Sequence, residues 1–219
     1  MAVADGDRML AVLPGDESRT HGERLPGELA RALEQAGIAR DRIDLLAVAT
    51  GPGAFTGLRI GLAAIQGLAM ALNKPVIGIS ALDALAAQAD ACGADLIVPW
   101  MDAQRGDVFA TLIDTKTATT LEPPTAAQPQ VLLESWRAHL AGRHAIFIGD
   151  AAARDARLIG ATAVDGLRET RWPKPLAPFI AALGHRRALD GEAGPPHALE
   201  PIYVRRPDAE IEREKRGQP

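Results

Sequence analysis

The sequence predicts an α/β fold built from two compact lobes, and three observations support this prediction. Short apolar runs of strand length alternate along the chain with stretches of helical periodicity. Hydrophobic residues make up 47% of the 219 positions, enough for one sizeable core or two smaller ones. Charged residues make up 24% and the mean hydropathy is −0.01, as in ordinary folded proteins and unlike disordered or membrane chains. We place the lobes at 1–94 and 95–206, followed by a charged tail at 207–219.

The N-terminal half is expected to open with a β-hairpin and then to alternate helices with strands. Because glycine tolerates positive φ, the turn Asp5-Gly6-Asp7 leads into a strand. Leu25, Leu29 and Leu33 share one helical face, and a later helix ends at Asn73-Lys74-Pro75 because proline resists continuation. The expected elements are a strand at 8–13, a helix at 25–36, a strand at 45–49, a helix from about 56 to 73, a strand at 76–79 and a helix at 81–91.

The C-terminal half is expected to continue the same alternation. The expected elements are strands at 96–101 and 108–113 joined as a hairpin, a helix at 131–140, a strand at 145–148 and a helix at 176–189. The stretch 122–130 holds three prolines and no periodicity, which predicts a loop. The two halves are also compatible with a diverged duplication, although no tandem repeat is visible.

A glycine-rich turn, Gly51-Pro52-Gly53-Ala54-Phe55-Thr56-Gly57, joins an expected strand to an expected helix. Such turns can point backbone amides at a phosphate. A Walker loop would end in Gly-Lys-Ser/Thr, whereas Leu58-Arg59 follows here, and the spacing of the dinucleotide-binding pattern also fails. The residues alone favour a tight turn with close helix packing and leave an anion site as the alternative.

The helix after this turn carries mostly small residues along one stripe and large apolar residues elsewhere. Small side chains allow another backbone to approach closely, so this stripe and the first helix are a candidate surface for a second protein, with a purely internal core as the alternative. The predicted interface residues are Leu25, Leu29, Leu33, Gly57, Leu58, Gly61, Ala64, Leu68 and Ala71. The large apolar residues Leu58, Leu62, Ile65 and Leu72 are expected to cover the remaining sides.

No pattern of residues specifies catalysis. The five histidines include no i, i+4 pair of the kind that places two imidazoles on one metal ion. Asp102 and Asp107 flank Arg105, which suits either an acid/base pair or a charged hairpin tip, and turn chemistry favours the tip. Cys92 is the only cysteine, which excludes an internal disulfide. We therefore expect no catalytic residue, metal or cofactor.

Charge and hydropathy indicate a cytoplasmic protein that does not bind nucleic acid alone. The net charge is −4 and the pI about 5.7, whereas a protein that grips a phosphate backbone usually has a basic face. Basic and acidic residues alternate in the C-terminal tail, as on a solvated helix. The apolar stretch 58–72 is shorter than the roughly 20 residues of a membrane span and is expected to be a buried helix. No secretory signal is visible.

The string from Gly51 to Gly61 resembles the GPGSFTGLRIG signature of the TsaB (YeaZ) family. The matching signature residues are Gly51, Pro52, Gly53, Phe55, Thr56 and Arg59, together with Asp102, Arg105 and Gly106 in a segment similar to the family's Asp-Ala-Arg-Arg-Gly-Glu-Val-Tyr. The helix start at His21 and the Pro-x-Tyr-x-Arg string at 201–205 also resemble family motifs. The likeness runs from about residue 8 to 206.

This resemblance implies an actin-like/Hsp70-like fold and a partner role without chemistry of its own. The expected partner is a TsaD-type subunit, which transfers threonylcarbamoyl to an adenosine of tRNA to make t6A. A TsaE-type ATPase joins that assembly, a second copy is an alternative partner, and a nucleotide at the partner junction is left open. The catalytic paralogue carries a histidine pair, of which only His21 has a counterpart here. The alternative function is a glycoprotease-like hydrolase or a phosphotransferase.

Family members begin with a strand resembling Ile-Leu-Ala-Leu-Asp-Thr, and this sequence starts after the corresponding position. That strand would be central in the N-terminal sheet, so its loss is expected to expose strand edges and leave an apolar groove. Our hypothesis is that the true start codon lies upstream of Met1. An upstream frame without a Leu-Asp-Thr-type strand would defeat it.

Overall fold

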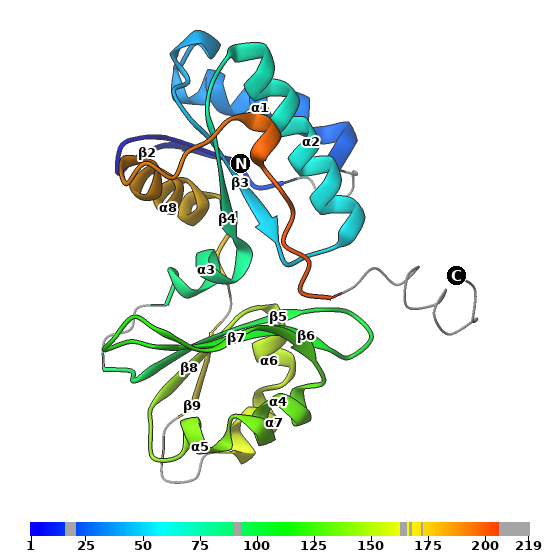
Figure 1. Cartoon of the computed structure of the whole chain (residues 1–219), viewed down its shortest axis with the longest axis vertical. Helices are drawn as coiled ribbons and strands as arrows, with labels where there is room; N and C mark the ends of the chain where they lie inside the picture. Colours follow the sequence, from blue (N-terminus) through cyan, green and yellow to red (C-terminus); the bar gives the residue numbers. More distant parts are fainter. Residues whose placement is uncertain (16–20, 90–92, 163–165, 167, 172, 206–219) are drawn as a thin grey trace, which may run out of the picture. The chain divides into compact units, whose positions relative to one another are not determined.

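The computed structural model describes residues 1–15, 21–89, 93–162, 166, 168–171 and 173–205 (Figure 1). Cys92 and the predicted tail at 207–219 lie outside the described residues, as do the side chains of residues 21–23. The chain divides into two compact units, one of residues 1–90 with 173–201 and the other of residues 91–172 with 202–219. The segment 173–201 therefore belongs to the first unit, not to the C-terminal lobe in which the sequence analysis placed it.

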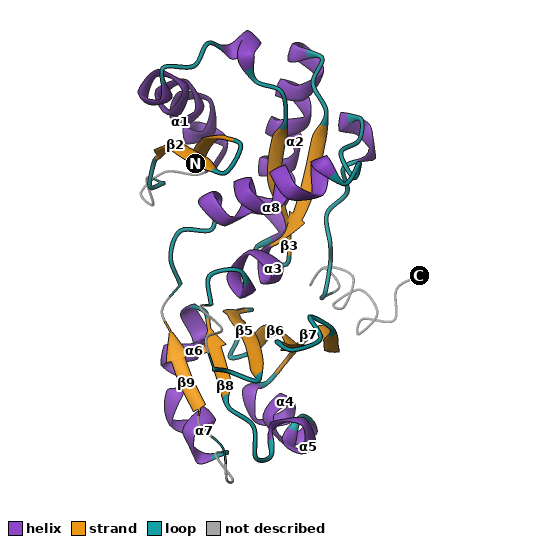
Figure 2. Cartoon of the chain, turned by 90° about the vertical axis from the view of Figure 1, so that its left-hand side faces the viewer, coloured by secondary structure: helices purple, strands orange, loops and turns teal. Residues whose placement is uncertain are grey.

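The strands of the first unit form two separate pairs (Figure 2). Strand β1 (Ala2–Asp5) pairs antiparallel with β2 (Arg8–Val12) across a turn in which Gly6 has φ +58°, as the sequence predicts. Strand β3 (Leu46–Gly51) pairs parallel with β4 (Val76–Ser80). The helices are α1 (His21–Ala36), α2 (Phe55–Leu72), α3 (Ala81–Ala86) and α8 (Ala177–Leu189), with short 3-10 turns η1 (Arg40–Arg42) and η2 (Pro196–Ala198).

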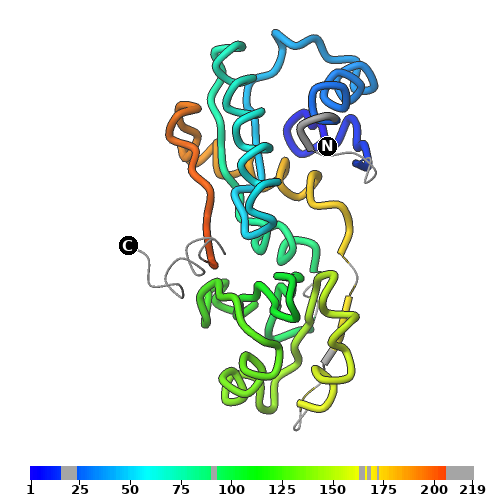
Figure 3. Tube along the Cα trace, turned by 90° about the vertical axis from the view of Figure 1, so that its right-hand side faces the viewer, coloured from blue at the N-terminus to red at the C-terminus, as the bar shows by residue number. Residues whose placement is uncertain are grey.

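Helix α8 explains why residues 173–201 join the first unit. It packs against β1, β3 and β4, and Figure 3 shows this returning stretch, in yellow and orange, beside the blue and cyan N-terminal elements. Gly184 permits the close approach, since an added Cβ would lie 2.8 Å from Cβ of Ala47 and 3.1 Å from Cγ2 of Ile77. The side chain of Gln66 on α2 also donates to the carbonyl oxygens of Pro196 and Leu199, both at 3.0 Å.

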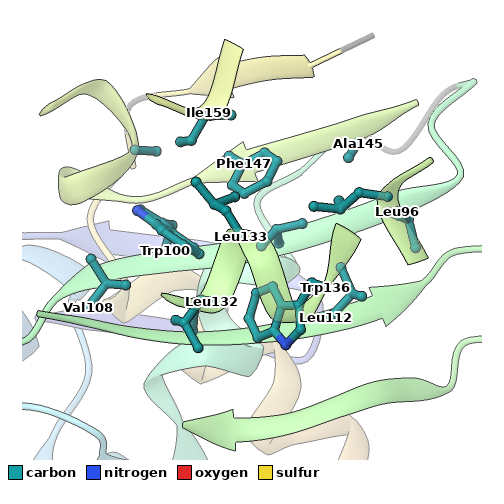
Figure 4. Close-up of a cluster of buried hydrophobic side chains, with 14 of the residues drawn as sticks. Leu96, Trp100, Val108, Leu112, Leu132, Leu133, Trp136, Ala145, Phe147 and Ile159 are labelled. Atoms are coloured by element: carbon teal, nitrogen blue, oxygen red, sulfur yellow. The ribbon is translucent and has the colours of Figure 1, made fainter. Parts of the chain in front are cut away.

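The second unit is a five-stranded mixed sheet with the order β7-β6-β5-β8-β9. Its strands are β5 (Leu96–Asp102), β6 (Val108–Asp114), β7 (Thr120–Ala127), β8 (Ala145–Ile148) and β9 (Arg168–Arg171). Its helices are α4 (Pro129–Ser135), α5 (Arg137–Leu140), α6 (Asp150–Arg154) and α7 (Ala156–Ala161). Trp100, Trp136 and Phe147 centre its core, with the Trp100 ring centroid 6.1 Å from that of Trp136 and 5.5 Å from that of Phe147 (Figure 4).

Several expected elements differ in the structure. The predicted loop at 122–130 is wrong, because most of it lies in β7, where Pro123 and Pro124 are exposed on an edge strand that tolerates missing N–H groups. The helix expected at 131–140 breaks at Trp136, which has φ −91° and ψ 4°. Helix α3 ends at Ala86, earlier than the predicted 91. Helices α6 and α7 and strand β9 were not predicted.

Candidate functional site

The glycine-rich turn leads from β3 directly into the longest described helix. Gly51 has φ +115° and a cis peptide bond to Pro52, and α2 starts at Phe55. Arg59 lies over the Phe55 ring, with Cζ 3.9 Å from the ring centroid, so two signature residues pack on each other in the first turns of the helix. The helix ends where Asn73 takes the left-handed conformation, as predicted.

Helix α2 is apolar but only partly covered by the rest of the described chain. Only Leu62 and Ala69 of its 18 residues are buried, and Met70 is 71% exposed. The expectation of a buried helix is wrong, because α2 packs on β3 along one side while its opposite side faces outward. Among the described helices, α2 alone is long and apolar enough to cross a membrane. A single helix of this kind is weak evidence for a membrane protein, because core helices of other proteins have the same length and composition.

The structure brings the two predicted interface helices together, since α1 packs against α2. On α2, Ala64 and Ala71 are exposed, whereas Gly57, Leu58, Gly61 and Leu68 are half-buried. On α1, Leu25 and Leu29 are half-buried, and Leu33 is only 5% exposed and therefore lies inside the unit. The exposed stripe is completed by three residues that sequence reasoning missed, namely Ala63, Gly67 and Met70. We call the exposed residues Ala63, Ala64, Gly67, Met70 and Ala71 the α2 surface.

Two glycines of α2 have no internal reason to be glycine. A Cβ added at Gly61 or Gly67 would meet nothing within 4 Å. Glycine destabilises a helix interior by about 1 kcal/mol relative to alanine. Their presence along an outward-facing apolar helix therefore favours close approach by another molecule.

An ion pair with little exposure lies within α1, the neighbouring helix. Nη1 of Arg24 lies 3.3 Å from Oε1 of Glu28, and the two side chains are 15% and 3% exposed. The i, i+4 spacing of opposite charges is the signal by which the sequence could have shown this pair. Losing one partner would leave the other charge buried, so the pair stabilises the folded state only while both members are present.

The β5–β6 hairpin tip holds the other signature residues. Gln104, Arg105 and Gly106 all have positive φ, at 61°, 54° and 85°. Asp107 pairs with Arg205, whose Nη1 also donates to the carbonyl oxygen of Ala103 at 3.0 Å.

Asp102, on the other side of the tip, also forms an ion pair with an arginine. Its Oδ1 lies 2.5 Å from Nη1 of Arg154, and its N–H donates to Oδ1 of Asp150 at 2.9 Å. The hydrogen bonds that Arg154 donates to the carboxylate of Asp155 raise the pKa of Arg154 above its ordinary value. Each carboxylate of the candidate acid/base pair is thus held by an arginine, an arrangement that suits a structural tip. Among the described residues no group of three or more His, Cys, Asp or Glu is placed to hold a metal ion.

The sequence has relatives among known proteins. It is 30% identical over 198 residues to the tRNA threonylcarbamoyladenosine biosynthesis protein TsaB of Bacillus subtilis, covering 88% of this chain and 82% of that protein. The chain belongs to the TsaB family. YeaZ from Pseudomonas aeruginosa superposes with a TM-score of 0.71 at 25% identity, covering 92% of both chains. These findings confirm the predicted family and the actin-like/Hsp70-like fold class.

The similarity of this TsaB-family chain extends to the transferases of the pathway. A family model described as TsaD, tRNA N6-adenosine threonylcarbamoyltransferase, matches residues 8–134. The tRNA N6-adenosine threonylcarbamoyltransferase of Gluconobacter oxydans is 36% identical over 92 residues, which is 41% of this chain and 25% of that protein. The residues matched by the model include α1 and α2.

Proposed function

We propose that this protein supports t6A synthesis in tRNA as a non-catalytic subunit that binds a TsaD-type threonylcarbamoyltransferase through α1 and the α2 surface. The observation that carries the proposal is an apolar 18-residue helix with only two buried residues, in a chain of the TsaB family. An apolar helix of this length with one exposed side is typical of a protein-binding surface.

Similarity to the transferase supports the choice of partner. Because the TsaD model matches residues 8–134, the partner has counterparts of α1 and α2. Two related subunits that present the same helices can associate across a pseudo-twofold axis, each helix pair packing on the other. Small residues at Gly61, Ala64 and Gly67 suit such close helix packing. A TsaE-type ATPase is a further member of the proposed assembly, which works in the cytoplasm.

The ion pairs of the two aspartates at the β5–β6 hairpin tip support the non-catalytic role. The carboxylates of Asp102 and Asp107 are held by Arg154 and Arg205, which leaves neither positioned as a base. The alternative, a hydrolase or phosphotransferase, predicts that the purified chain turns over a peptide or transfers a phosphate without a partner.

The proposal is tested by measuring binding of the cognate transferase to the Met70→Asp variant. Met70 is 71% exposed, so the change should leave folding intact while placing a charge in an apolar contact. We expect binding at least about tenfold weaker, a loss of about 1.4 kcal/mol, in calorimetric titration. The matched control is Val131→Asp on α4, where the side chain is 57% exposed and outside the α2 surface.

The control variant should bind like the unchanged chain. Equal affinity of a folded Met70→Asp variant would remove the α2 surface from the interface. In a reconstituted t6A assay, the transferase without this chain should be slow, and the chain without the transferase should be inactive.

A further inference from the structure

Gln66 is the only polar residue of α2 beyond the first two turns of the helix. Apolar residues lie on every side of α2, so contacts between apolar side chains alone do not decide which side faces outward. A polar side chain can decide it, because an amide that is buried without a hydrogen-bond partner is unfavourable. The orientation of α2 therefore depends on where the Gln66 amide finds its partners.

The Gln66 amide is bound by residues 194–199, which we call the strap. Its Nε2 donates to the carbonyl oxygens of Pro196 and Leu199, both at 3.0 Å, so each N–H of the amide has an acceptor. Figure 1 shows this segment, in orange, running beside α2, and α2 packs against η2 within it. The two hydrogen bonds link the middle of α2 to one place on the strap.

The strap is also held without Gln66, at the edge of β4 that faces away from β3. Val76 and Gly194 exchange two backbone hydrogen bonds of 2.9 Å there. Leu199 is 9% exposed and belongs to a buried apolar cluster with Leu46 and Val76. Because β3 pairs with the other edge of β4, a further strand beside β3 would leave the strap in place. The strap is thus a fixed reference for α2.

Gln66 lies on the border between the buried and the exposed side of α2. Residues three and four positions apart are neighbours on a helix surface. Among these neighbours of Gln66, Ala63 and Met70 are exposed members of the α2 surface. The other two, Leu62 and Ala69, are the buried residues of the helix. A turn of α2 about its axis would therefore break the contact of Gln66 with the strap and exchange residues between the two sides.

We infer that Gln66 is a positioning residue that keeps the α2 surface outward, and that it couples docking of the strap to binding of the transferase. This inference rests on the proposed function, in which the transferase binds the α2 surface. With the amide bound to the strap, α2 presents one fixed arrangement of small residues and Met70. A partner that binds this arrangement favours the docked strap, and the coupling works equally in both directions.

Calorimetric titration of the Gln66→Met variant with the cognate transferase tests the positioning role. Methionine is a side chain of similar length that donates no hydrogen bond to the strap. We expect binding to be about fivefold weaker or more, the size of a typical coupling between sites. Gln66→Lys should restore most of the affinity, because its ammonium group can donate to the same carbonyl oxygens.

The matched control is Ile79→Val, which lowers the stability of the same unit at a different place. Ile79 is fully buried in the cluster that contains Ile180 of α8, so the change leaves Gln66 and the strap untouched. Urea unfolding compares the stabilities of the variants, and Ile79→Val should bind the transferase like the unchanged chain. An equal loss of affinity in Ile79→Val and Gln66→Met would overturn the inference, because affinity would then follow overall stability.

Hydrogen–deuterium exchange tests the coupling at the strap itself. Saturating transferase should slow exchange of the Val76 and Gly194 amides in the unchanged chain, and Gln66→Met should abolish this protection. Equal protection in both chains would overturn the coupling. If Met70→Asp weakens binding while Gln66→Met does not, the α2 surface stands and only the positioning role fails. If neither change affects binding, the proposed function fails as well.

Discussion

Gly149 occupies a position that no other residue can take. It follows β8 with φ +151°, and an added Cβ would lie 2.0 Å from the carbonyl oxygen of Trp100. That carbonyl belongs to the central strand β5 and cannot move without disturbing the Trp100 ring in the core. The glycine is therefore required by backbone-to-backbone contact.

Gly149→Ala should destabilise the chain by at least about 2 kcal/mol, since both the backbone angle and the contact are unfavourable. Urea unfolding followed by tryptophan fluorescence measures the change. Gly160→Ala is the matched control, because Gly160 lies in α7 and an added Cβ meets nothing within 4 Å. The control should be neutral or slightly stabilising, and an equal loss in both variants would contradict the contact argument.

Asp114 links stability to acid pH. The hydrogen bond from Arg143, at 2.5 Å, lowers the pKa of this carboxyl from 3.8 to about 2, helped by the N–H groups of Thr117 and Lys116. A carboxyl whose pKa is lower in the folded state stabilises that state when ionised. Its contribution is therefore complete above about pH 4 and is lost as the pH falls towards about 2.

At pH 7 we expect the free energy of unfolding of Asp114→Asn to be lower than that of the unchanged chain. This difference should shrink between pH 4 and pH 2. Urea titrations across this range provide the measurement. Arg143→Gln should show the same loss of pH dependence, because it removes the group that lowers the pKa. A constant difference at all pH values would mean that the ionisation of Asp114 contributes nothing.

At Gly61 in helix α2, stability of the folded chain and binding of the partner should favour different residues. A side chain at Gly61 meets no atom of the chain, so Gly61→Ala should stabilise the folded state by about 0.5–1 kcal/mol through helix propensity. If the partner helix packs closely here, the same methyl group should weaken binding of the transferase. Thermal unfolding and calorimetric titration of one variant measure both effects. Higher stability together with unchanged affinity would show that Gly61 lies outside the interface.

The elements that the sequence predicted are those with strong local signals. The β5–β6 hairpin and α2 were predicted almost to their ends, because turn residues and the Asn73 cap mark them. Strand β7 was missed because its prolines are tolerated only at a sheet edge, and the edge is set by distant pairing with β6. The sequence also did not show which side of α2 faces outward, because apolar residues on every side of the helix leave no amphipathic pattern.

At the scale of the molecule, the signature at 51–61 predicted the family, while the division into units depended on tertiary contacts. The return of α8 to the first unit is set by its packing on β1, β3 and β4, including the close contact at Gly184. No local pattern in 176–189 says which sheet this helix covers. The candidate surface on α1 and α2 stays a prediction, although the structure shows that Leu33 is buried and that Met70, which the sequence analysis did not include, is exposed.

The α2 surface should also drive self-association, because a surface that fits a related subunit can fit a second copy. We expect the chain to form dimers at high concentration in sedimentation velocity and Met70→Asp to remain monomeric. Added transferase should convert dimers into heterodimers at a one-to-one ratio, since one helix pair cannot serve two partners at once. A ternary species with two copies of this chain bound through an intact dimer would place the two interfaces on different surfaces.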